Sequence, residues 1–296
     1  MTTLTHLGKA NIRIACHAIT WGRNGLEQCI TDITELGFRG IETFAFVVDD
    51  YAGREQQFRD MLAAKRLQLV CLYGGGALID PAIAREEIEK NLRFARFLQA
   101  CGADRLTLGG GTRRPEGNTP DDYRQMARTM EEIGRRTLDM GILSCYHPHY
   151  GTAVQNRDEI TTIFELCDPR YVFMTADPAH MAKAGYDPVE VFRTYRDRIK
   201  YVHMKDYKPL TPEQQAEQQR QRTARQSGAE AATAIITDFV ELGEGIIDIP
   251  ALFRVLEEAG YDGWVTLELD RSTRTPRIST EMNKRYIEEK LGLKVG

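Results

Sequence analysis

Short apolar runs rich in β-branched residues alternate along the chain with longer stretches in which apolar residues recur at helical spacing. Such a run bounded by turn residues favours a buried strand, and parallel strands need a helical crossover between them. The alternation occurs eight times, which predicts a (β/α)₈ barrel. The expected strands are 12–19, 40–45, 67–72, 104–108, 142–147, 171–176, 199–204 and 264–269. The expected helices lie near 25–36, 53–65, 84–100, 120–140, 156–166, 188–196, 250–259 and 279–291.

The alternation is interrupted once, after the seventh expected strand. The stretch at about 209–238 is rich in Gln, Arg and Ala, which is typical of a solvated helical insertion. It follows a strand end, where barrel active sites form, so a lid or a subunit contact is the alternative. The whole chain, 1–296, is expected to form a single barrel domain that carries this insertion.

The composition of the chain argues against several classes of protein. The 39 basic and 43 acidic residues give a net charge of −4, so no basic surface for nucleic acid is expected. No run reaches the ~20 apolar residues of a membrane span, and the N-terminus does not read as a signal peptide. The six cysteines form no CxxC pair and lie mostly in apolar runs, which favours buried thiols. We therefore expect a cytoplasmic protein.

Ligand-type residues follow four consecutive expected strands. These are His147 after the fifth, Asp177 after the sixth, His203 in the seventh and Glu268 in the eighth. Each residue alone is more often a cap or a hydrogen-bonded core residue, but a barrel would bring all four to one rim. Two imidazoles and two carboxylates predict one divalent metal ion, with Mn²⁺ first and Co²⁺, Fe²⁺, Mg²⁺ or Zn²⁺ as alternatives.

Three short motifs carry a family resemblance. DPAH at 177–180, VHMKD at 202–206 and TLELD at 266–270 resemble the xylose-isomerase-like TIM barrel superfamily of sugar-phosphate isomerases and epimerases. The resemblance runs from the first strand to the last and implies that Asp177, His203 and Glu268 bind the metal. Family members commonly carry a Glu-Pro-His-like element after strand five. This chain has His147-Pro148-His149, so His147 takes the place of the fourth ligand.

Two segments are similar to those of one subfamily. CYHPHYGTAVQN and FVELGEGIIDIPALFRVLEEAGYDGWVTLELD resemble the corresponding stretches of inosose dehydratases, as does a long insertion after the HxKD motif. Metal-dependent C-glycoside deglycosidases are close to this group. The resemblance implies a metal-dependent lyase that acts on a keto sugar, keto-glycoside or keto-cyclitol by enolisation and β-elimination. The alternative is an isomerase or epimerase of a ketose or sugar phosphate. Ketose 3-epimerases of the family use two metal-bound glutamates, and one of them is missing here.

These expectations assign roles to further residues near the strand ends. The expected partner is a small carbohydrate, bound by a protein that is expected to form a homo-oligomer. A DNA-repair endonuclease is disfavoured by the acidic balance, and an accessory subunit that kept the fold is disfavoured by the intact ligand set. We expect catalytic roles for His147, Glu268, His149 and Lys205, and substrate-binding roles for His180, Glu42, Trp21 and His17.

Overall fold

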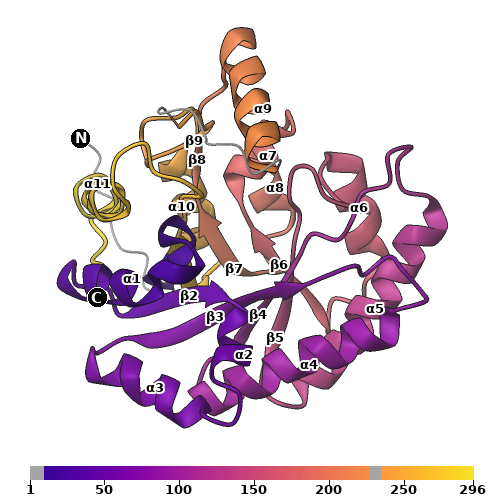
Figure 1. Ribbon diagram of the computed structural model, residues 1–296. Helices are drawn as coiled ribbons and strands as arrows, with labels where there is room; N and C mark the ends of the chain where they lie inside the picture. Colours follow the sequence, from indigo (N-terminus) through magenta and orange to yellow (C-terminus); the bar gives the residue numbers. More distant parts are fainter. Residues whose placement is uncertain (1–9, 227–234) are drawn as a thin grey trace.

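The computed structural model describes residues 10–226 and 235–296. Within these residues eight parallel strands close into one barrel in the order β1-β10-β7-β6-β5-β4-β3-β2 (Figure 1). The predicted (β/α)₈ barrel is therefore confirmed. The barrel strands are β1 (Asn11–His17), β2 (Gly40–Phe44), β3 (Gln68–Gly75), β4 (Arg105–Gly109), β5 (Leu143–His147), β6 (Val172–Ala176), β7 (Ile199–Met204) and β10 (Asp262–Leu267).

Helices follow the barrel strands and cover the outside of the barrel (Figure 1). Their apolar faces pack on the strands, as the helical spacing of apolar residues predicts. The covering helices are α1 (Leu26–Glu35), α3 (Glu55–Ala64), α4 (Ala84–Cys101), α5 (Pro120–Leu138), α6 (Arg157–Leu166), α8 (Pro188–Thr194), α10 (Ile249–Glu258) and α11 (Pro276–Leu291). Two short helices, α2 (Phe46–Asp50) and α7 (Pro178–Lys183), follow β2 and β6 directly.

Most strand boundaries differ slightly from those predicted, and two of the differences concern candidate site residues. The first strand ends at His17, not at 19, because the His17 side chain accepts a hydrogen bond from the backbone N–H of Ile19 and caps the 3₁₀ turn Ala18–Trp21. The last barrel strand runs from Asp262 to Leu267, so Glu268 lies just beyond its end. His17 therefore ends its strand and Glu268 follows the end of its strand, so both lie at the rim.

The interruption after the seventh strand has regular structure at its base. β8 (Asp206–Tyr207) pairs antiparallel with β9 (Phe239–Val240), and between them α9 (Pro212–Gln226) projects away from the barrel (Figure 1). α9 lies where a helical insertion was predicted. Residues 227–234 of the predicted insertion lie outside the described residues.

Side chains fill the barrel interior in layers, so the barrel is a core and not a pore. One layer comes from β1, β3, β5, β7 and β10 and comprises Ala15, Val70, Cys71, Cys145, Tyr201 and Trp264.

All six cysteines of the chain are buried and unpaired, as predicted for inert thiols. Among the described residues, no helix is long and apolar enough to cross a membrane.

The carboxyl ends of β3 and β4 consist of glycines that approach each other closely. Gly75 has a left-handed φ of 89°, and a Cβ there would collide with the backbone of Gly109. A Cβ on Gly109 would collide with the ring of Tyr73. At Gly75 and Gly109, therefore, no side chain projects from the barrel rim.

Candidate metal centre

The barrel brings together the four residues predicted as metal ligands. His147 ends β5, Asp177 follows β6, His203 lies in β7 and Glu268 follows β10. All four side chains are buried, none more than 7% exposed. His147, Asp177 and His203 offer ligand atoms that lie within 4.8 Å of one another. Glu268 joins them through His203, whose Nδ1 is 2.8 Å from Glu268 Oε2.

The contacts of His203 fix which of its nitrogens is free to bind a metal. Its Nε2 lies 2.9 Å from Glu42 Oε2, and because a carboxylate only accepts, Nε2 carries the proton. Nδ1 of the neutral ring then presents a lone pair toward Glu268 Oε2 at 2.8 Å. Two acceptor atoms at this distance repel unless a positive charge lies between or beside them. The pair therefore needs a positive charge, which either a second proton on the ring or a bound cation can supply.

The metal-free chain can supply that positive charge only as a proton. Burial disfavours the charged form of His203, but Glu42 and Glu268 outweigh burial and raise the pKa of His203 to about 10. A second proton on this ring takes the place that a cation would have. A metal ion bound at Nδ1 would displace this proton from His203.

Four buried atoms without a hydrogen-bond partner support this centre. Buried polar atoms in native proteins are nearly always paired, so a cluster of unpaired ones indicates a missing ion or ligand. Each of the four predicted ligands contributes at least one such atom, and His147 contributes both ring nitrogens. Taken one per residue, they make two imidazole nitrogens and two carboxylate oxygens, a donor set that suits a divalent transition metal. The atoms are His147 Nε2, Asp177 Oδ2, His203 Nδ1 and Glu268 Oε2.

A second grouping of metal-type residues, His17 with His203 and Glu268, competes with this centre. The backbone N–H of Ile19 donates to His17 Nδ1 at 2.9 Å. The neutral ring of His17 therefore carries its proton on Nε2, which lies 3.7 Å from Glu42 Oε1 and has no lone pair for a metal. In the grouping with His147 and Asp177, by contrast, His147 Nε2 and Asp177 Oδ2 are free of hydrogen bonds.

The two carboxylate oxygens of Asp177 have different roles: one caps a helix, and the other faces the proposed metal centre. Oδ1 accepts from the backbone N–H groups of Ala179 and His180 and so caps α7, whose first residue is Pro178. Oδ2 has no hydrogen bond and lies 3.6 Å from His147 Nε2. The Asp-Pro pair thus explains the local turn and directs one oxygen into the barrel mouth.

Lys205 is buried beside the centre among carboxylates. Its Nζ lies 2.8 Å from Glu268 Oε1, 2.7 Å from Asp270 Oδ1 and 3.5 Å from Asp177 Oδ2. Burial lowers its pKa, but Asp270, Glu268 and Asp177 outweigh burial and raise the pKa of Lys205 well above its ordinary value. With Glu42 counted, one fixed cation faces four acidic groups, and a divalent ion would bring the local charge closer to neutrality. Sequence reasoning missed Asp270, although it is the last acid of TLELD.

Two further histidines stack beside Lys205. The rings of His149 and His180 have centroids 3.6 Å apart, and Lys205 Nζ lies 3.4 Å from His180 Nε2. Because an ammonium only donates, His180 Nε2 accepts, and its buried Nδ1–H has no hydrogen-bond partner. His149 Nδ1 donates to the backbone oxygen of Tyr150 at 2.7 Å, so its Nε2 keeps a lone pair. Burial lowers the pKa of His149 to about 3 and keeps its ring neutral.

Three residues predicted to bind substrate have other contacts in the structure. Glu42 is fully buried, lies against His203 and accepts a hydrogen bond from Tyr201 at 2.8 Å. His17 caps the turn after β1. The Trp21 indole donates to Asp32 on α1 at 2.8 Å, which directs it toward that helix. Of these three residues, Glu42 has the direct link to the proposed ligands.

The link between Glu42 and His203 leads to a prediction. Substituting Glu42→Gln removes the negative charge that fixes the proton on His203 Nε2, so we expect metal affinity to fall about 10- to 100-fold. Titration against a competing chelator measures this. Glu241→Gln is the control, because Glu241 is also buried but pairs with Arg274 outside the centre. Equal metal affinity in Glu42→Gln and wild type would contradict the role of Glu42.

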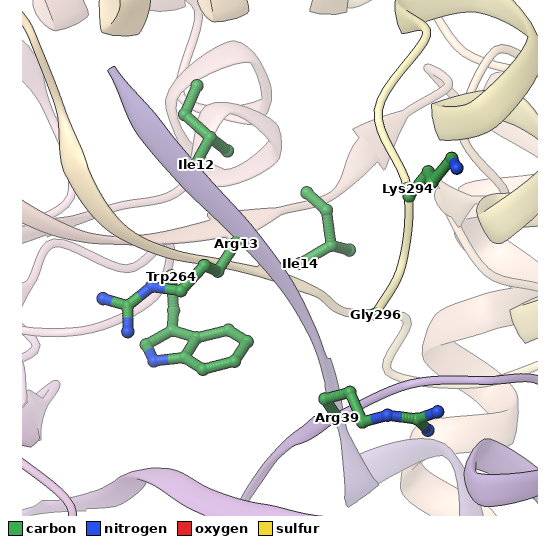
Figure 2. A pocket seen from close by; sticks show the side chains of 7 residues that line it. All are labelled: Ile12, Arg13, Ile14, Arg39, Trp264, Lys294 and Gly296. Atoms are coloured by element: carbon green, nitrogen blue, oxygen red, sulfur yellow. The ribbon is translucent and has the colours of Figure 1, made fainter. Parts of the chain in front are cut away.

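A separate hollow of about 310 Å³ lies beside the amino-terminal end of β1, opposite the centre. It is lined by Arg13, Arg39 and Lys294 among other residues. Figure 2 shows that Arg13 points toward Trp264 and away from Lys294, and the guanidinium of Arg13 lies 4.8 Å from the Trp264 ring centroid. Because its cations diverge and it holds no acid–base pair, this hollow is not the candidate site.

Comparison with known proteins identifies the family. A family model described as xylose isomerase-like TIM barrel matches residues 30–290, and the chain belongs to this family. An inosose dehydratase of Clostridium botulinum is 27% identical over 285 residues, which cover 91% of each protein.

Two solved structures share the fold. The probable 3-DHS dehydratase of Bacillus anthracis has a TM-score of 0.71 at 17% identity and matches 91% of this chain and 97% of its own. The IolI protein, solved with a zinc atom, has a TM-score of 0.73 at 14% identity and matches 94% of this chain and 97% of its own.

Proposed function

We propose that this protein is a metal-dependent lyase that dehydrates a keto-cyclitol or a related keto sugar. The observation that carries the proposal is the set of four buried, unpaired ligand atoms on His147, Asp177, His203 and Glu268. The inosose dehydratase relative, which matches over 91% of this chain, supports the choice of reaction and substrate class. The proposed metal is Mn²⁺, which accepts mixed nitrogen and oxygen ligands.

The donor at the end of strand five favours elimination over symmetric epimerisation. An epimerase that moves a proton between two metal-bound glutamates needs a carboxylate at this position, and the chain has His147. With His147 and Glu268 as ligands, the neighbouring residues are left to move protons. A divalent cation bound here supplies Lewis-acid polarisation of the substrate carbonyl.

The chain's own groups fit the remaining steps. The low pKa of His149 makes its ring a weak base, but His149 Nε2 has the lone pair needed to take the proton from the carbon next to the carbonyl once that C–H is acidified. His180 Nδ1–H is a buried donor that can pass its proton to the departing hydroxyl while His180 Nε2 takes a proton from the Lys205 ammonium, so that the ring stays neutral and the hydroxyl leaves as water with both electrons of its C–O bond. Lys205, beside His180, stabilises the negative oxygen formed between these two events. The substrate thus loses one proton and one hydroxide, and the product is an unsaturated ketone.

The test is incubation of the purified, Mn²⁺-loaded protein with a keto-inositol and, separately, with a panel of free and phosphorylated ketoses. We expect a new enone absorbance with the keto-inositol and no new stereoisomers from the ketoses. Parallel samples loaded with Co²⁺, Zn²⁺ or Mg²⁺ rank the metals. New ketose isomers without any enone would replace the lyase by an isomerase or epimerase.

A further inference from the structure

The base of the insertion is tied to the barrel by backbone hydrogen bonds. β8 and β9 pair, and the Lys208 N–H donates to the Asp238 carbonyl at 2.8 Å. The buried Asp206 carboxylate accepts from the backbone N–H groups of Gly243 and Gly245 at 2.9 and 3.1 Å, just after β9. These contacts give residues on β9 a defined place at the barrel mouth.

Phe239, on β9, lies against two groups of the site, His180 and Lys205. Its ring is 6% exposed and lies edge-on to His180, with centroids 4.8 Å apart at 72°. Lys205 Nζ lies 4.7 Å from the centre of the same ring. An aromatic face attracts a cation, and this attraction grows when water is excluded. The ring therefore touches a proposed proton donor and the cation next to it.

A second cation, Lys183, also lies near the Phe239 ring. Lys183 on α7 lies 2.6 Å from Asp238 Oδ2 and 4.8 Å from the centre of the Phe239 ring. The same Lys183 lies 5.0 Å from the ring of Tyr150, in the loop after β5. Phe239 is therefore held by the pairing of β9 with β8 and by Lys183 of α7, which itself lies against the loop after β5.

We propose that Phe239 is a positioning residue that orients His180 and Lys205 and keeps bulk water from the metal centre. The catalytic part of this inference rests on the proposed function, since it needs His180 and Lys205 to act on substrate. The insertion then contributes one wall of the site. An apolar wall next to proton-transfer groups strengthens their electrostatic interactions and protects the charged intermediate from water.

The test compares Phe239→Ala and Phe239→Leu with Val240→Ala. Val240 is the neighbouring residue of the same two-residue strand and points to the opposite face, so it controls for strand packing. All variants are loaded with Mn²⁺ to equal metal content. Water-proton relaxation then measures solvent access to the ion, and keto-inositol turnover gives kcat and KM separately.

We expect Phe239→Ala to increase the relaxation enhancement and to lower kcat about 10- to 100-fold with a smaller change in KM, because small displacements of positioned groups are costly. Phe239→Leu should fall between Phe239→Ala and wild type, and Val240→Ala should match wild type. Unchanged relaxation in Phe239→Ala, or an equal response of Val240→Ala, would overturn the proposal. If no variant or wild type converts the keto-inositol but relaxation still rises in Phe239→Ala, the proposed function fails and the shielding role stands.

Discussion

Asp177→Asn should yield a folded protein that no longer holds a metal ion and has lost at least about a thousandfold in activity, since a metal contributes several kcal/mol of charge stabilisation. Asparagine keeps an oxygen that can accept from the N–H groups of Ala179 and His180, so the cap of α7 survives. It removes the charge on the oxygen that faces His147. Metal analysis and circular dichroism of the purified variant measure the two effects.

The matched control for this substitution is Asp187→Asn. Asp187 caps α8 in the same way, through a hydrogen bond from the Val189 N–H at 2.9 Å, but it lies outside the ligand set. We expect this variant to keep a full equivalent of metal and wild-type turnover. A metal-replete Asp177→Asn protein would mean that the four strand-end residues do not form the cation site.

Lys205→Met should abolish most activity and destabilise the fold by about 3–5 kcal/mol, the typical cost of removing one partner from a buried ion pair. Methionine preserves the length of the side chain but leaves Glu268, Asp270 and Asp177 without their shared counterion. Urea unfolding of metal-free samples measures the free energy of unfolding, and the keto-inositol assay of metal-loaded samples measures turnover.

Lys183→Met provides the comparison for stability. Lys183 pairs with the single carboxylate of Asp238, and its side chain is 21% exposed, so we expect a loss of only about 1 kcal/mol or less. Similar stability losses in the two variants would show that Lys205 does not have the special electrostatic role inferred from its three carboxylate neighbours.

The strand ends were predictable because barrel geometry alone decides where they meet. His147, Asp177 and His203 come from parts of the chain some 26 to 56 residues apart, yet parallel strands carry them to one rim. The apolar runs locate the strands, and the polar residue that ends each run marks the rim. The four proposed ligands could be selected from the sequence on this basis.

The contacts around those ligands were not predictable in the same way. Glu42 meets His203 across the barrel interior, so its place depends on side-chain direction and not on its strand alone. The Trp21 indole donates a hydrogen bond to Asp32 on α1, a contact that its position in the sequence does not specify. Phe239 lies on a two-residue strand whose sequence has no periodic signal. Such details depend on loop geometry, which hydrophobic patterning does not specify.

The glycines that end β3 and β4 lie on a different side of the barrel mouth from the proposed cation ligands. The proposed cation ligands all come from the segment between β5 and β10, whereas Gly75 and Gly109 present only backbone on the other side. Changes in the loops that follow β3 and β4 would therefore reshape one side of the mouth without replacing any proposed cation ligand.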